Sequence, residues 1–249
     1  MTTSGHHQLS VRPRLDELLV HRGFASDTAG ARALVLARDV RVDGAIATRP
    51  AETVPFDATL ALRDRPRFVS RGGEKLTAVL DATEIAVEGK RCLDVGASTG
   101  GFTDCLLQHG ASNVVAVDVG YGQLSTSLRD DIRVEVRERT NARTLDTLDP
   151  QVDLLTVDVS FISLTTVLPA VLQSVRFGGD ALVLIKPQFE ARRTQVEPGG
   201  VVRNSLVHAE VVGRCAAWAL KRGLQLRGIF RSPLLGPAGN REFFLWLRV

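Results

Sequence analysis

The chain has 249 residues, of which 44% are hydrophobic and 24% charged, with a net charge of +3, and this composition is typical of a soluble globular protein. The mildly basic balance permits a polyanionic partner without requiring one. The three cysteines lack the paired spacing of a metal site or disulfide framework, so no metal is expected. The sequence contains no signal peptide and no apolar run of roughly 18 residues. We therefore expect a cytoplasmic protein outside the membrane, with a monomer favoured.

Residues 12–64 are expected to form a small α+β module after a flexible start over residues 1–11. Leucines at helical spacing between residues 15 and 19 predict a first helix. The pair Ser26-Asp27 offers an N-cap for a second helix. The Asp43-Gly44 pair is typical of the turn in a short β-hairpin.

This order of two short helices and a hairpin resembles the RNA-binding domain first seen in small-subunit ribosomal protein four. The module contains eight Arg and eight Asp or Glu residues, so it has no net positive charge. RNA binding would therefore require its arginines to gather on one face. A packing or dimerisation module with solvated charges is the alternative. The candidate RNA-binding residues are Arg12, Arg14, Arg32, Arg38 and Arg41, with Arg67 and Arg71 in the segment that follows.

Residues 65–74 are expected to be an interdomain linker with the sequence Arg-Pro-Arg-Phe-Val-Ser-Arg-Gly-Gly-Glu. Proline and paired glycines are typical of an adaptable loop. The segment is locally positive and lies where two domains would meet, which suits a contact that guides an RNA strand.

From residue 75 to residue 249, helices and strands alternate, and this order predicts an α/β domain with a doubly wound, mostly parallel sheet and a closing antiparallel hairpin. The expected helices cover residues 76–85, 102–109, 164–175 and 208–222. The expected strands cover residues 91–95, 113–118, 134–137, 152–158, 180–186, 226–232 and 242–248.

A glycine loop, Gly96-Ala-Ser-Thr-Gly-Gly, lies between the first of these strands and the next helix. Glycines there let the backbone approach a ligand, and Asp118 at the end of the second strand can accept hydrogen bonds from both hydroxyls of a ribose. The spacing matches neither a P-loop nor a dinucleotide fingerprint. A tight turn in an unliganded sheet is the alternative.

The stretch from Asp94 to Thr103 resembles the S-adenosyl-L-methionine loop of class I (Rossmann-like) methyltransferases. That resemblance implies S-adenosyl-L-methionine as the cofactor. The expected cofactor-binding residues are Asp94, Gly96, Ser98, Thr99, Gly100, Gly101, Phe102, Asp118, Val119, Asn141 and Asp158.

Four charged residues are expected at the same crevice. The chain has only four lysines, and two of them lie at motif positions: Lys75 starts the first helix and Lys186 ends the fifth strand. Asp158 ends the fourth strand and Glu242 begins the last, so all four reach the edge where functional groups collect in such sheets. A buried charge requires a partner, and alternating lysines and carboxylates supply one. A structural salt-bridge network is the alternative.

This Lys-Asp-Lys-Glu set resembles that of ribose 2'-O-methyltransferases of the heat-shock RNA methyltransferase group. More closely, residues 12–249 resemble the TlyA family, also called haemolysins. The supporting stretches include Ser70-Arg-Gly-Gly-Glu-Lys, Asp158-Val-Ser-Phe-Ile-Ser and Lys186-Pro-Gln-Phe-Glu. One departure is Arg67-Phe-Val-Ser, where some relatives carry Ala-Trp-Val-Ser. This departure leaves open whether the linker couples RNA binding to cofactor binding.

The resemblance implies methylation of cytidine 2'-hydroxyls in ribosomal RNA, in the small subunit and often the large. We expect Lys186 to take or orient the hydroxyl proton, Asp158 to hold Lys186, and Glu242 to balance Lys75. Three alternatives are a ribosome-assembly factor that binds RNA without catalysis, a membrane-lytic haemolysin and a pseudouridine synthase. No membrane segment supports lysis, and the glycine loop argues against the synthase.

Overall fold

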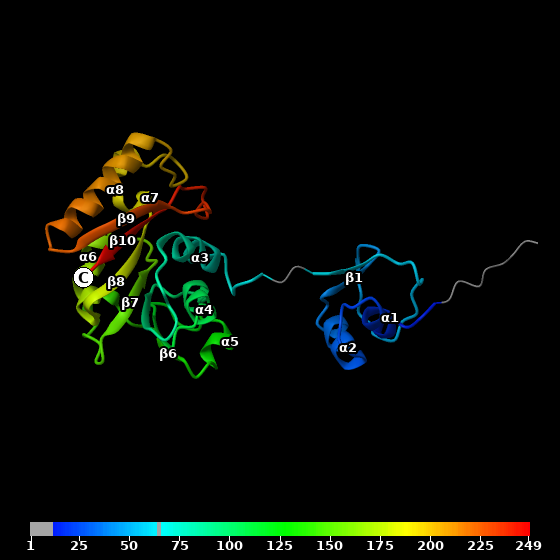
Figure 1. Ribbon diagram of the computed structural model, residues 1–249. Helices are drawn as coiled ribbons and strands as arrows, with labels where there is room; N and C mark the ends of the chain where they lie inside the picture. The colour runs from blue at the N-terminus through cyan, green and yellow to red at the C-terminus, as the bar shows by residue number, and fades with distance from the viewer. Residues whose placement is uncertain (1–11, 64–65) are drawn as a thin grey trace, which may run out of the picture. The chain divides into compact units, whose positions relative to one another are not determined.

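The computed structural model describes residues 12–63 and 66–249. The expected flexible start over residues 1–11 lies outside the described residues. The chain divides into two compact units, Met1–Pro66 and Arg67–Val249, and each has its own hydrophobic core (Figure 1).

The first unit packs two short helices beside a small antiparallel sheet. Its elements are α1 (Leu15–His21), α2 (Thr28–Leu36), β1 (Val40–Val42), β2 (Ala45–Ile46) and β3 (Leu60–Leu62). The strand order is β2-β1-β3. The side chain of Asp27 accepts a hydrogen bond from the Gly30 amide and so caps α2, as the sequence predicts.

The second unit is built on a seven-stranded sheet with the order β6-β5-β4-β7-β8-β10-β9. The first five strands in this order are parallel, and β10 is antiparallel to both of its neighbours. The strands are β4 (Arg91–Val95), β5 (Asn113–Val117), β6 (Val134–Arg137), β7 (Val152–Val157), β8 (Val175–Ile185), β9 (Gln225–Arg231) and β10 (Phe243–Arg248). The expected mostly parallel sheet with a closing antiparallel hairpin is confirmed.

Helices cover both faces of this sheet (Figure 1). Side chains of α3 (Gly72–Thr83) and α4 (Gly101–Gln108) share one core with one face, and those of α6 (Leu164–Val171) and α8 (Ser205–Leu220) share another core with the opposite face. The short elements are α5 (Thr126–Arg129), α7 (Pro187–Glu190) and the 3-10 helices η1 (Ala142–Thr144), η2 (Leu172–Ser174) and η3 (Arg193–Gln195).

The glycine pair Gly72-Gly73 begins α3, although the sequence places it in a linker and starts the helix at Leu76. A Cβ on Gly73 would come within 2.1 Å of the buried Phe68 ring. Gly73 therefore serves close packing rather than chain flexibility. Two short helices, α5 and α7, are not expected from the sequence. Pro187 opens α7 at a position where the absent N–H costs nothing.

Candidate active site

Two adjoining cavities lie at the carboxyl ends of the parallel strands. The larger cavity has a volume of about 650 Å³, within the usual range for small-molecule sites. The smaller cavity has a volume of about 220 Å³. Gly96, Ser98 and Asp158 line both, so the two cavities meet at the glycine loop and the end of β7.

Gly96 lets the glycine loop approach β7. Its φ is +86°, and a Cβ at this position would lie 2.4 Å from the carbonyl oxygen of Asp158. No other residue type fits both the backbone angle and this contact. The close approach brings the carboxylate of Asp158 to the junction of the cavities.

Asp118 fixes the rim of the larger cavity. Its carboxylate accepts hydrogen bonds from the backbone N–H of Ser98, at 2.8 Å, and of Gly120, at 2.6 Å. Each carboxylate oxygen has two acceptor sites, so the side chain keeps capacity for ligand hydroxyls. This arrangement fits the role expected of an acidic residue at the end of the second strand.

Asp94 does not line either cavity, which differs from the expected direct contact with a cofactor. The residue is fully buried, and its two carboxylate oxygens accept hydrogen bonds from the hydroxyls of Thr103, at 2.7 Å, and Thr156, at 2.9 Å. Burial raises the pKa of Asp94 to about 6, the two threonines oppose the rise, and the nearby Asp158 adds to it. The structure thus places Asp94 beneath the loop, where it ties α4 to β7.

The other residues expected at the cofactor site divide between the cavities. Val119 and Asn141 line the larger one, whereas Thr99, Gly101 and Phe102 line the smaller one. Gly100 lines neither. A Cβ on Gly100 would lie 2.2 Å from a methyl carbon of Leu128 in α5, so this glycine is required for helix packing.

The four expected catalytic charges form two ion pairs. Lys186 Nζ lies 2.6 Å from Asp158 Oδ1, and Lys75 Nζ lies 2.6 Å from Glu242 Oε2. The Lys75–Glu242 pair is buried, and the other pair is largely shielded from solvent. Lys75 lines the smaller cavity and Asp158 lines both.

Strand register explains why the two pairs are neighbours. Phe243 of β10 pairs with Ile185 of β8 in an antiparallel ladder, so Glu242 and Lys186 come next to each other at the end of that ladder. The remaining carboxylate oxygen of Glu242, Oε1, is buried and has no hydrogen-bond partner among the described residues. A buried acceptor of this kind is costly unless a ligand or water satisfies it.

Several residues of the site were missed by sequence reasoning. Lys186 Nζ donates a hydrogen bond to Ser160 Oγ at 2.9 Å. Ser160 belongs to the stretch Asp158-Val-Ser-Phe-Ile-Ser in the loop after β7, and Ser70 begins the stretch Ser70-Arg-Gly-Gly-Glu-Lys, so these two stretches are the signals that could have indicated them. Ser70 and Pro237 also line the smaller cavity, and no pattern in the sequence marks Pro237.

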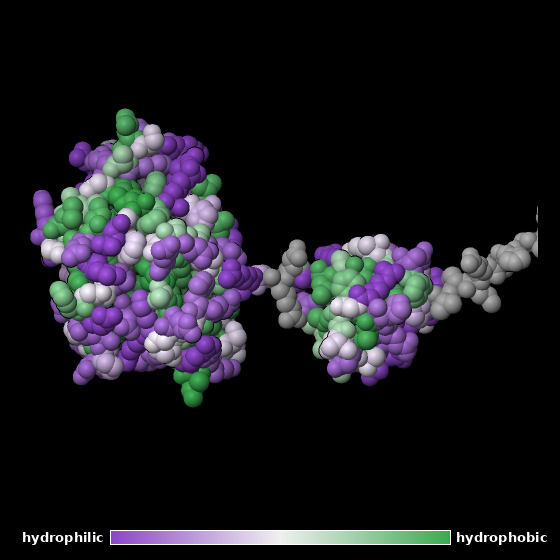
Figure 2. Space-filling model, viewed as in Figure 1, coloured by the Kyte–Doolittle hydropathy of each residue, from purple (hydrophilic) through white to green (hydrophobic). Residues whose placement is uncertain are grey.

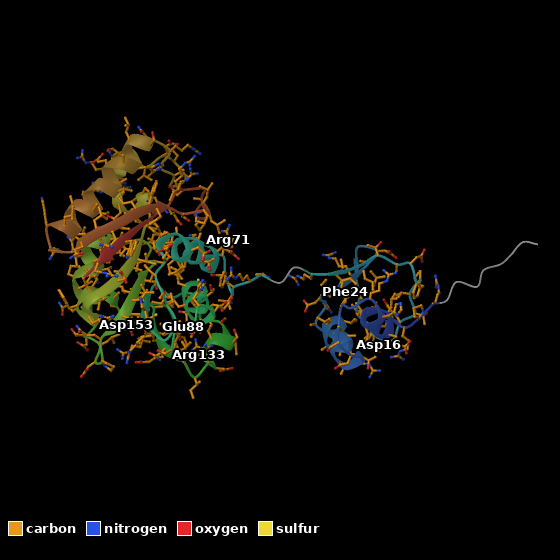
Figure 3. All side chains as sticks on the ribbon, in the orientation of Figure 1. Asp16, Phe24, Arg71, Glu88, Arg133 and Asp153 are labelled. Carbon is orange, nitrogen blue, oxygen red and sulfur yellow. The ribbon has the colours of Figure 1, made fainter. Side chains whose placement is uncertain are left out.

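The expected RNA-binding arginines differ in their contacts. Arg14 and Arg32 both bind the buried carboxylate of Asp16, so their charges are partly neutralised within the first unit. Asp16 is labelled in Figure 3. No contact among the described residues joins Arg12, Arg38 or Arg41 to that pair. In the second unit, Arg67 stacks on Phe68 and lies outside both cavities, whereas Arg71 lines the smaller cavity at the start of α3.

Comparison with known proteins identifies the family of this chain. The FtsJ-like methyltransferase family matches residues 68–249, and the S4 domain family matches residues 13–60. The 16S/23S rRNA (cytidine-2'-O)-methyltransferase TlyA of Mycobacterium tuberculosis (strain H37Rv) is 50% identical over 241 residues, which cover 95% of this chain and 90% of that protein. The chain belongs to the TlyA family. Its second unit is accordingly a methyltransferase domain and its first an S4 domain.

Other TlyA-like proteins carry a different name. Hemolysin A of Brachyspira hyodysenteriae is 37% identical over 92% of this chain and 97% of its own length. A solved structure described as a hemolysin from Streptococcus thermophilus has a TM-score of 0.72 and 38% identity, with coverage of 96% of this chain and 89% of that one. Within the part of this TlyA-family chain that the structure describes, no helix has the length and apolar character needed to cross a membrane.

Proposed function

We propose that this chain transfers a methyl group from S-adenosyl-L-methionine to the 2'-hydroxyl of cytidine in ribosomal RNA of the small subunit and of the large subunit. The observation that carries the proposal is the pair of Lys–carboxylate contacts beside two adjoining cavities. One cavity has the size of a small-molecule site, and the other opens beside Lys75. The relatives named as rRNA (cytidine-2'-O)-methyltransferases support the choice of substrate.

The residues present fit the cofactor. Asp118 would hold its ribose hydroxyls, Asn141 and Val119 would line the base, and the Gly96 loop would lie against its methionine end. When bound, S-adenosyl-L-methionine supplies an electrophilic methyl group. The lining of the larger cavity and the positive φ of Gly96 support this assignment.

The chain's own residues would prepare the ribose hydroxyl. A hydroxyl of this kind is a poor nucleophile near neutral pH and gains from a positioned base. Lys186 is held by Asp158 and Ser160, so its amine has a defined direction. Lys186 takes or orients the hydroxyl proton, while Glu242 fixes the position of Lys75 near the site. Positioning of the nucleophile then contributes much of the rate.

The S4 domain would supply RNA affinity. Among its described arginines, Arg12, Arg38 and Arg41 form no ion pair, so their charges are available to phosphates. Arg71 at the smaller cavity would contact the strand near the target ribose. These contacts would act through phosphate charge and so weaken as salt concentration rises.

The first experiment is to incubate purified ribosomal subunits with labelled S-adenosyl-L-methionine and to map ribose methylation. We expect Lys186→Ala to lower the turnover rate by at least about 100-fold, which is the lower end of the range for loss of a general base. Binding of S-adenosyl-L-methionine, measured by calorimetry, should stay nearly unchanged. Lys221→Ala, an exposed lysine in α8's C-terminal turn, is the matched control and should keep full activity. Substantial turnover by Lys186→Ala would contradict the catalytic assignment.

A further inference from the structure

A groove rimmed by arginines lies on the second unit, apart from both cavities of the active site. Its volume is about 470 Å³. The floor is formed by His208 and Val212 of α8, Ile229 of β9 and Phe243 of β10. The rim consists of Arg203, Arg231 and Arg241. We call this feature the arginine groove.

The floor of the groove is apolar and partly aromatic. The rings of His208 and Phe243 lie with centroids 5.6 Å apart at an interplanar angle of 58°. Ile229 is 45% exposed, so its side chain is accessible from the groove. A hydrophobic area lies where α8 and β9 run side by side, with hydrophilic residues next to it (Figure 2).

The rim carries uncompensated positive charge. Arg203 is paired with Glu197. Arg231 and Arg241 are exposed and form no ion pair with any residue that the structure describes. Two free guanidinium groups above an apolar floor match a phosphate joined to a planar base, because guanidinium binds phosphate oxygens in a bidentate manner and bases stack on aromatic rings.

The groove opens at the same end of the sheet as the catalytic charges. Phe243 pairs with Ile185 on one side and with Arg231 on the other. Arg231 is therefore two strand spacings, about 10 Å, from the end of β8 where Lys186 lies. Arg241 directly precedes Glu242, and Asn240 holds the neighbouring loop through hydrogen bonds to Val202 and Gly200.

We propose that the arginine groove binds a nucleotide of the RNA substrate that flanks the methylated residue, with its phosphate on Arg231 and Arg241 and its base against the floor. The inference rests on the proposed function, since it names a second contact for the same RNA. The ends of β8 and β9 lie about 10 Å apart, so we assign the groove to a flanking nucleotide and not to the target ribose itself.

The test is the double variant Arg231→Gln with Arg241→Gln, assayed for methyl transfer to ribosomal subunits at several salt concentrations. We expect KM for the subunit to rise about tenfold while kcat and the affinity for S-adenosyl-L-methionine stay within about twofold. The slope of log KM against log salt should fall by roughly 0.7 to 0.9, because the variant neutralises one phosphate fewer than the wild type. The control is Arg222→Gln with Arg227→Gln, which removes the same charge from the turn after α8 and from β9, outside the groove.

A second measurement identifies the occupant. A benzophenone-bearing amino acid in place of Ile229 should form a photo-crosslink to ribosomal RNA near the methylated cytidine. A crosslink only to a ribosomal protein, or KM and salt slopes equal to those of the control variant, would overturn the inference. If the wild-type protein methylates neither subunit, the proposed function fails instead; a crosslink to RNA under those conditions would still support the groove as an RNA site.

Discussion

Asp94 is a carboxylate held in the core without a counter-ion among the described residues. The hydroxyls of Thr103 and Thr156 and the backbone N–H of Thr103 contact its oxygens, and burial raises its pKa to about 6 from an ordinary value of 3.8. The folded protein therefore binds a proton at Asp94 more readily than the unfolded chain. Its contribution to stability falls as pH rises from about 4 to about 6 and is constant above that window.

We predict that Asp94→Asn removes this dependence. The free energy of unfolding of the variant, relative to wild type, should increase by up to about 3 kcal/mol between pH 4 and pH 7. Urea titrations followed by tryptophan fluorescence would measure it. Parallel pH curves for the two proteins would refute the assignment.

Asp153 provides a control, because its pKa is shifted in the opposite direction to that of Asp94 (Figure 3). Burial acts to raise its pKa, but hydrogen bonds from Arg176 and from the Arg91 amide outweigh burial, so the pKa is lowered. Its contribution is present above the unfolded pKa and is lost as pH falls. Asp153→Asn should therefore lose stability relative to wild type as pH rises through about 4.

At the scale of elements, the segment from Arg67 to Arg71 forms a wall of the smaller cavity. Phe68 is buried against α3, the Val69 amide donates to Asp104 of α4 at 2.8 Å, and the Gln108 side chain donates to the Arg67 carbonyl. Ser70 and Arg71 then line the cavity. The docking of five residues on α3 and α4 thus completes the site beside Lys75.

We predict that Asp104→Ala loosens this segment. Hydrogen exchange at the Val69 amide should become about tenfold faster, which corresponds to loss of one hydrogen bond to a charged group of about 1.4 kcal/mol. Methyl transfer should fall at the same time, because Ser70 and Arg71 lose their fixed positions. Asp81→Ala, an exposed change in α3, is the control. Unchanged exchange at Val69 would show that Phe68 and the Gln108 hydrogen bond hold the segment without Asp104.

At the scale of the whole molecule, the two units have separate cores, and that of the S4 domain is small. Over residues 12–63, ten buried hydrophobic residues make up its core, and small cores give low stability. Its buried Asp16 binds Arg14 and Arg32, and the hydrogen bond from Arg14 holds the pKa of Asp16 well below its usual range. This ion cluster contributes stability above about pH 4 and loses it as pH falls further.

Both tryptophans, Trp218 and Trp246, belong to the methyltransferase domain. We predict that urea unfolding of the full chain followed by far-UV circular dichroism begins at a lower urea concentration than unfolding followed by tryptophan fluorescence. Asp16→Asn should move the early dichroism transition to lower urea by leaving two arginines without their carboxylate, and should leave the fluorescence curve in place. Coincident curves for both proteins would mean that the domains unfold as one unit.

Much of this architecture was accessible from sequence because it follows local patterns. The apolar strands, the loop at Gly96 and the charged residues at strand ends predicted the sheet and the neighbourhood of Lys186. Both ion pairs were expected from the cost of burying unpaired charge. What sequence could not supply was three-dimensional packing: the use of Gly73 for contact with Phe68, and the burial of Asp94 beneath its own loop.

The contacts of the arginines in the S4 domain could not be predicted from sequence either. The resemblance of the module to an RNA-binding domain suggested that these arginines share one face, but sequence does not reveal that Arg14 and Arg32 are directed to Asp16. The arginine groove was also beyond reach, because its arginines come from separate segments: the pairing of β9 with β10 brings Arg231 and Arg241 together, and Arg203 comes from the loop before α8.

The place of β10 in the sheet has a consequence for protein synthesis. This strand is made after all the others, yet it lies between β8 and β9 and carries the fully buried Phe244. A growing chain cannot close the sheet or bring Glu242 to Lys75 until residues 243–248 have left the ribosome. A premature stop codon shortly before Phe243 would therefore leave β8 and β9 as open edges that favour aggregation, even though most of the domain had been translated.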